Sequence, residues 1–190
     1  MNATNVQFQS ASMTQTVVAG ARCLTPIQPM TAPRPLRSEN IPQALSLAAR
    51  YRLLHEPSET ESICLDVLEV DPDNQEALAL LVLALTDSDS TGQAQGIPDA
   101  RPFARRLRCS FERAYYLGII AERRAKGRLS KHSPGAAHVA YEGLREAMGW
   151  YEQAAPKNDD AILRWNTCAR LIARNRLSAR LDEHPELPLE

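Results

Sequence analysis

The chain has 190 residues, of which 44% are hydrophobic and 24% charged, as in a globular protein rather than a disordered or collagen-like one. The formal net charge is −1, which excludes a bulk electrostatic attraction of the whole molecule to nucleic acid or to membranes. No apolar run reaches the roughly 18 residues of a transmembrane helix, so we expect no membrane span and a cytoplasmic protein.

The N-terminal segment, residues 1–38, is rich in Ser, Thr, Gln and Pro and has no acidic residue before Glu39. It shows no helical periodicity, which predicts a disordered tail. Two alternatives stay open for it. The missing acids also suit an organelle transit peptide, and Met13 or Met30 could be the true start of the protein.

Two helices are expected first in the domain that follows. The first begins near Asn40, with Pro42 in its first turn, where a missing N–H costs nothing, and runs to about His55. The second begins at Ser58, whose hydroxyl is expected to cap it while Glu61 reaches back, which is a capping box. Short links of this kind favour antiparallel neighbours.

The next segments alternate between helical and loop patterns. Asp71-Pro72 is expected to start a third helix that runs through Leu85. Residues 87–100 contain Ser, Asp, Gly and Pro and predict a loop. A long helical stretch over about 101–129 follows, and the sequence leaves open whether it is one helix or two.

The last two helices complete about six. A fifth is expected after Ser133-Pro134, with Ser133 as its cap, and runs to about Ala155. A sixth covers about 159–181. The sequence therefore predicts an all-α domain over residues 39–182, followed by a loose C-terminal tail at 183–190.

One helix–turn–helix pattern recurs along this domain. Its first copy places a closing turn at 71–74 and apolar or small residues at Ala44, Leu47, Ala48, Tyr51, Thr60, Cys64 and Val67. The first half returns from Leu78, from Ala114 and from Trp165. The small residue at the fifth place of the pattern is expected to let the two helices of a unit approach closely.

Over residues 40–176 this pattern resembles the tetratricopeptide family, whose unit of about 34 residues stacks with its neighbours. The resemblance implies a right-handed superhelical array of antiparallel helix pairs. It also implies a non-catalytic scaffold that holds a peptide or partner helix in a concave groove. A plain helical bundle is the alternative architecture.

The charges are segregated along the chain. Residues 53–100 contain eleven acidic residues and no Lys or Arg, whereas residues 101–131 contain ten basic residues and two acidic ones. Three interpretations are open: solvated helix faces that attract each other, a basic groove for an acidic peptide, or a nucleic-acid surface. The third would use an arginine and aromatic stripe formed by Arg105, Arg106, Arg108, Arg113, Phe111, Tyr115 and Tyr116.

The helix around 113–124 is apolar on most sides, which predicts a central position. Glu112 and Glu122 stand beside arginines and are expected to form i,i+3 or i,i+4 pairs. Core packing is the favoured role for Tyr151, and also for Trp165. As partner-binding candidates we nevertheless select six first-helix residues: Tyr115, Tyr116, Arg123, Arg124, Trp165 and Arg170.

Catalysis is not expected. The sequence contains no Gly-rich phosphate loop, nucleophile elbow or dinucleotide fingerprint. The four cysteines form no CxxC pair and the four histidines are scattered, so we expect neither a metal nor a cofactor. The expected partner is a protein or peptide, including an acidic one. Nucleic acid is the alternative partner, and an accessory subunit of an enzyme is the remaining alternative.

Overall fold

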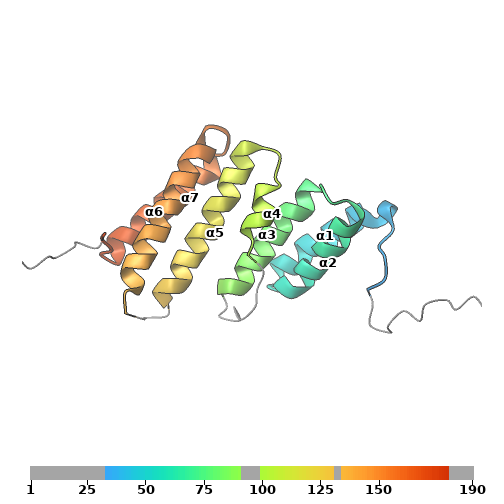
Figure 1. Ribbon diagram of the computed structural model, residues 1–190, viewed down its shortest axis with the longest axis horizontal. Helices are drawn as coiled ribbons and strands as arrows, with labels where there is room; N and C mark the ends of the chain where they lie inside the picture. The colour runs from blue at the N-terminus through green and yellow to red at the C-terminus, as the bar shows by residue number, and fades with distance from the viewer. Residues whose placement is uncertain (1–32, 91–98, 131–133, 180–190) are drawn as a thin grey trace, which may run out of the picture. The chain divides into compact units, whose positions relative to one another are not determined.

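The computed structural model describes residues 33–90, 99–130 and 134–179, and every regular element in them is helical (Figure 1). The all-α prediction is confirmed, with seven α-helices in the described part of the chain instead of about six. They are α1 Ile41–Leu53, α2 Pro57–Val70, α3 Gln75–Ser90, α4 Arg101–Arg105, α5 Ser110–Ser130, α6 Ala136–Ala154 and α7 Asp159–Arg174, with short 3-10 turns at Ser38–Asn40 and Ala155–Lys157.

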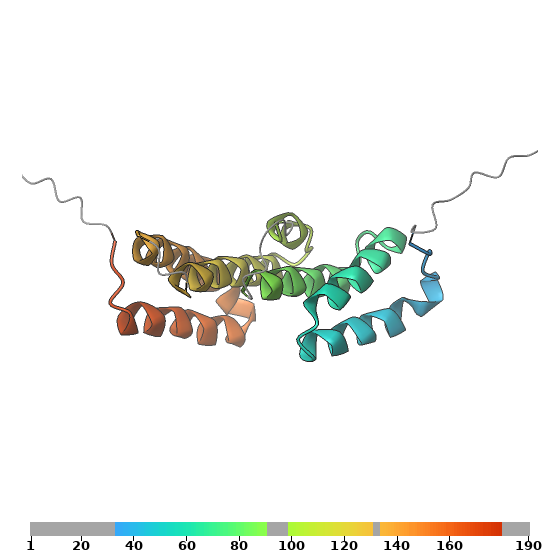
Figure 2. The ribbon, with the colours of Figure 1, turned by 90° about the horizontal axis from the view of Figure 1, so that it is seen from below.

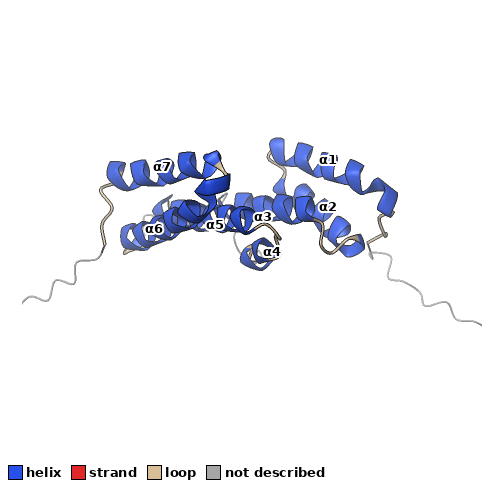
Figure 3. Cartoon of the chain, turned by 90° about the horizontal axis from the view of Figure 1, so that it is seen from above, coloured by secondary structure: helices blue, strands red, loops and turns tan. Residues whose placement is uncertain are grey.

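The chain divides into two units, Met1–Arg34 and Pro35–Glu190, and all of these helices belong to the second. The predicted N-terminal tail and the C-terminal tail at 183–190 fall almost wholly outside the described residues. Within the second unit, α2, α3, α5 and α6 form a layer, with α1 and α7 on one side of it and α4 on the other (Figures 2 and 3).

The helix α5 joins two hydrophobic clusters. Its Leu117 and Ile120 pack with buried residues of α1, α2 and α3, whereas its Ile119 and Ala121 pack with those of α6 and α7. Eight of the residues of α5 are buried, so its predicted central position is confirmed.

Close approach of α5 and α6 depends on small residues. A Cβ built on Gly118, the fifth residue of the third repeat copy, would lie 2.5 Å from the Tyr151 ring of α6. Two turns later in α5, Ala125 lies against Gly143, two turns earlier in α6, so the helices run antiparallel. The predicted role of the small fifth residue is confirmed at this position.

The stretch 101–129 forms two helices, because α4 ends at Arg105 and α5 begins only at Ser110. No Pro or Gly marks the break. It is held by tertiary contacts instead: the Leu107 side chain is buried, the Arg108 backbone N–H donates to Gln75 Oε1 at 2.7 Å, and Arg113 donates to the Leu107 carbonyl at 2.8 Å. Helix α4 packs against both α3 and α5.

Both predicted helix caps are wrong. Helix α2 begins at Pro57 with no side-chain cap, and its Thr60 hydroxyl instead donates to the Glu56 and Ala48 carbonyls at 3.2 Å. That second bond ties α2 to α1. Helix α6 is preceded by Gly135 at φ +76°, a left-handed conformation that glycine adopts without strain, so Ser133 is not its N-cap.

Two helix boundaries also differ from the prediction. Helix α3 starts at Gln75 rather than at Asp71-Pro72, because the Asn74 side chain accepts from the Ala77 N–H at 3.0 Å. It continues to Ser90, so residues 87–90 are helical and not loop. Helix α7 ends at Arg174, seven residues before the expected end at 181.

Candidate functional site

The six partner-binding candidates fall into four places. Tyr115, Tyr116 and Arg123 lie on α5 among contacts to α3 and α7. Arg124 lines a cavity between α4, α5 and α6, whereas Trp165 lines a smaller one beside the end of α6. Arg170 lines a third hollow, on α7. The structure therefore does not bring the six residues together in one groove.

The Arg123 side chain is 17% exposed and joins α5 to α3. Its guanidinium pairs with Asp87 at 2.7 Å and donates to the Leu83 carbonyl at 3.0 Å and to the Thr86 hydroxyl. Every one of these partners belongs to α3. These contacts engage both terminal nitrogens of the guanidinium, so the side chain stabilises the α3–α5 contact.

Glu122 is the polar centre of the α5–α6–α7 packing, and the sequence showed only part of its role. An i,i+4 pair of the expected spacing exists, but with Lys126 and not with one of the neighbouring arginines. The Glu122 side chain is 1% exposed and also accepts from Tyr151 Oη at 2.5 Å and Arg164 Nη1 at 3.2 Å. Arg164 Nε in turn donates to the Tyr115 hydroxyl at 3.1 Å.

The protonation states in this cluster follow from its contacts. Burial alone raises the pKa of Glu122, but the hydrogen bonds from Lys126 and Tyr151 and the nearby positive charges outweigh burial and lower it. Burial and the Glu122 charge raise the pKa of Tyr151, which keeps the phenol protonated as a donor. The carboxylate is therefore charged, hydrogen-bonded within the protein and shielded from solvent. It acts in the packing of α5, α6 and α7 and not as a reactive group.

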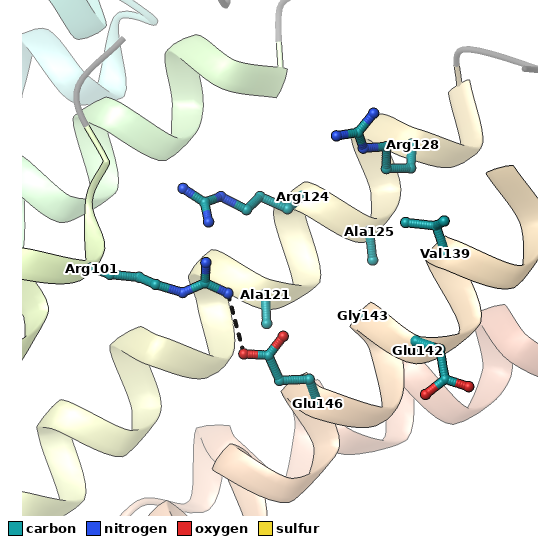
Figure 4. Close-up of a pocket in the computed structure, with 9 residues that line it drawn as sticks. All are labelled: Arg101, Ala121, Arg124, Ala125, Arg128, Val139, Glu142, Gly143 and Glu146. Atoms are coloured by element: carbon teal, nitrogen blue, oxygen red, sulfur yellow. Dashed lines mark hydrogen bonds and ion pairs between the residues drawn. The ribbon is translucent and has the colours of Figure 1, made fainter.

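A cavity of about 500 Å³ lies between α4, α5 and α6 (Figure 4). Its base is made of small residues, Ala121 and Ala125 of α5 and Gly143 of α6. Charged and apolar side chains surround that base: Arg101, Arg124, Arg128, Val139, Glu142 and Glu146. Three arginines from two helices therefore converge on one hollow.

The arginines of this cavity differ in how they are held. Arg101 pairs with Glu146 at 3.2 Å, and Arg124 pairs with Asp99 at 2.6 Å. Both acids are 46% exposed, and exposed pairs of this kind stabilise by only about 0–1 kcal/mol each. Arg128 is exposed and has no ion-pair partner within the part of the chain that the structure describes. The cavity can thus receive carboxylates at little cost.

The first interpretation of the charge segregation, attraction between neighbouring helix faces, agrees with several contacts. Besides the pairs of Arg123 and Arg124, Arg108 pairs with Asp73 at 3.5 Å and Arg106 donates to the Pro72 carbonyl. The same contacts engage most of the arginines in the stripe considered for nucleic-acid binding. Of its four arginines, Arg105 alone lacks a partner among the described residues.

Trp165 combines packing with an open edge. Its indole N–H donates to Glu152 Oε1 at 3.0 Å, and its ring borders a largely apolar cavity of about 210 Å³. Ile162, 48% exposed, and the fully buried Tyr151 complete the wall. Core packing is confirmed for Tyr151, whereas Trp165 is half-buried.

No protein-family model, curated protein or solved structure matches this chain. Across residues 33–90, 99–130 and 134–179, no helix is long and apolar enough to cross a membrane. In the same ranges, no three His, Cys, Asp or Glu side chains gather as a metal site would require.

Proposed function

We propose that this chain is a non-catalytic interaction module, with its helix pairs stacked as in the tetratricopeptide family, that binds an acidic segment of a protein partner. The observation that supports this function is the convergence of Arg101, Arg124 and Arg128 on the cavity of about 500 Å³ between α4, α5 and α6. A guanidinium presents a planar fork of donors that matches a carboxylate, so three of them favour a multiply acidic ligand.

Binding proceeds by exchange of partners. Incoming carboxylates replace Glu146 on Arg101 and Asp99 on Arg124, while Arg128 gains a partner for the first time. Because the two existing pairs are solvent-exposed, their loss costs little. The small base formed by Ala121, Ala125 and Gly143 leaves room for the backbone of an extended segment.

The proposal is tested by fluorescence anisotropy with the full chain and a fluorescein-labelled Glu-rich peptide. At about 50 mM salt, where screening is weak, the wild type should bind and the Arg101→Gln/Arg124→Gln/Arg128→Gln variant should bind at least about tenfold more weakly. The matched control is Arg50→Gln, an exposed arginine of α1 far from this cavity in sequence, which should leave affinity unchanged.

Two results would contradict this function. Equal affinity of the triple variant and the wild type would show that the three arginines are not the site. Tighter binding of a single-stranded oligonucleotide than of the Glu-rich peptide would favour the nucleic-acid alternative.

A further inference from the structure

A second stretch of the chain is basic and contains no acidic residue. Between Ala161 and Leu181 the sequence contains five arginines and no Asp or Glu. Arg164 is already committed, because it holds Glu122, Tyr115 and Asp160. The arginines that follow it on α7 have no such partners among the described residues, unlike most of the arginines of the basic block at 101–131.

Two of these arginines share a hollow. Arg170 and Arg174 lie one helical turn apart on α7 and, with Thr167 and Leu171, line a space of about 370 Å³. Both side chains are exposed, and neither forms an ion pair or hydrogen bond with any residue that the structure describes. None of the described residues that line this hollow is a carboxylate, in contrast to the cavity between α4, α5 and α6.

The local energetics of α7 account for one of the two arginines. Arg174 stands in the last turn, where the helix dipole favours a positive charge. Arg170 stands a full turn earlier, and two like charges at i,i+4 destabilise a helix by a few tenths of a kcal/mol. An anion held between the two guanidinium groups would remove that repulsion.

We propose that Arg170 and Arg174 bind a phosphate monoester group, with Leu171 packing against the group that carries it. A phosphate monoester has a charge between about −1.5 and −2 at neutral pH, so one such group matches both arginines. A single carboxylate would neutralise only one of them. A phosphodiester strand is disfavoured because no aromatic ring for base stacking is among the described residues that line the hollow.

This site is separate from the one proposed for acidic segments. Helix α7 lies on the side of the α5–α6 layer opposite to α4, and the two hollows share no lining residue (Figure 3). The two proposals therefore fail independently, because substitutions at one site leave the other unchanged.

The test uses the full chain and a fluorescein-labelled peptide that contains one phosphoserine, with the serine and glutamate versions of the same peptide. Anisotropy should show that the phosphoserine peptide binds and that Arg170→Gln and Arg174→Gln each weaken it by about tenfold, the loss expected for a charged hydrogen bond. Inorganic phosphate is titrated against ¹⁵N-labelled protein, with the arginine Nε–H signals of Arg170 and Arg174 as the readout.

Control variants and control probes show what each outcome means for the proposal. Arg50→Gln and Arg128→Gln should bind the phosphoserine peptide as wild type does, and circular dichroism should show all variants folded. If only the phosphopeptide binds, the ligand of this site is a phosphorylated protein. If inorganic phosphate also binds, the site accepts free phosphate ions as well. Equal affinity for the glutamate peptide, no binding of either phosphate probe, or equal or tighter binding of oligo-dT overturns the proposal.

Discussion

Replacing Glu122 by Gln tests whether its buried carboxylate holds α7 against α5 and α6. Gln keeps the size and shape of the side chain but removes its charge. The carboxylate accepts from Tyr151, Lys126 and Arg164, so the change weakens contacts to both neighbouring helices at once. The neutral amide also places an N–H₂ group among these donors.

The expected loss can be estimated from these contacts. A hydrogen bond to a charged group stabilises by about 1.5–3 kcal/mol, and removing one partner of a fully buried ion pair costs about 3–5 kcal/mol. The Lys126 and Arg164 side chains are 42% and 30% exposed, so water can solvate both cations once the carboxylate is gone. We therefore expect a loss of about 2 kcal/mol in the free energy of unfolding and a Tm lower by about 6 °C.

The pH dependence gives a second, independent readout. The folded-state pKa of Glu122 lies below its ordinary value of 4.5, because the Lys126 and Tyr151 hydrogen bonds and nearby cations outweigh burial. A lowered folded pKa means that the stabilisation is complete above about pH 4.5 and is lost as the pH falls through the folded pKa. The difference between wild type and Glu122→Gln should thus be largest at pH 7 and shrink towards about pH 3.

Urea unfolding followed by circular dichroism measures the free energy of unfolding and its dependence on pH. Glu112→Gln is the control, since Glu112 is an exposed carboxylate of the same helix, and it should change the free energy of unfolding by less than about 0.5 kcal/mol. The reasoning is refuted if Glu122→Gln is as stable as this control at pH 7. It is equally refuted if its deficit stays constant as the pH falls to about 3.

Two further predictions concern packing and thiol reactivity. Gly118→Ala should lower the free energy of unfolding by about 1–3 kcal/mol, because the new Cβ would overlap the fully buried Tyr151 ring. Gly127→Ala places its Cβ in open space and should stabilise α5 by about 0.5–1 kcal/mol. Thermal unfolding followed by circular dichroism measures both changes. Burial raises the pKa of the Cys64 and Cys168 thiols to about 12, so iodoacetamide at pH 8 should leave both unmodified in the native protein and alkylate them in urea, as peptide mass spectrometry would show.

The helices could be predicted because their apolar periodicity is local information. The first repeat copy, with its small Ala48 facing Thr60, gave the α1–α2 pair to within a few residues. The break after Arg105 could not be seen, since the interactions that stabilise it come from Gln75 and from the burial of Leu107. Those contacts form only when α3 is already in place, and no local breaker residue marks them.

The role of Glu122 shows the same limit for polar side chains. Sequence spacing indicated an i,i+3 or i,i+4 pair for Glu122, but the residue that forms it is Lys126 and not one of the arginines beside Glu122. It could not indicate Tyr151 or Arg164, which reach Glu122 only through the packing of α6 and α7 against α5. A glutamate in an otherwise apolar stretch was the one available signal, and i,i+4 pairing explained it without burial.

Charges that are segregated along the sequence can become neighbours when the chain folds. The acidic block at 53–100 and the basic block at 101–131 are neighbours in sequence, and α3 packs directly against α4 and α5. Three ion pairs join the two blocks among the described residues: Arg108 with Asp73, Arg123 with Asp87 and Arg124 with Asp99. An excess of basic residues in a segment is therefore a poor guide to a binding surface when an acidic segment lies beside it in the fold. Arg128 lacks a partner within the described residues, and so do Arg170 and Arg174, which no acidic side chain of α7 can reach. Unpaired arginines that line a hollow, rather than the most basic stretch of sequence, mark the places where this protein can bind an anion.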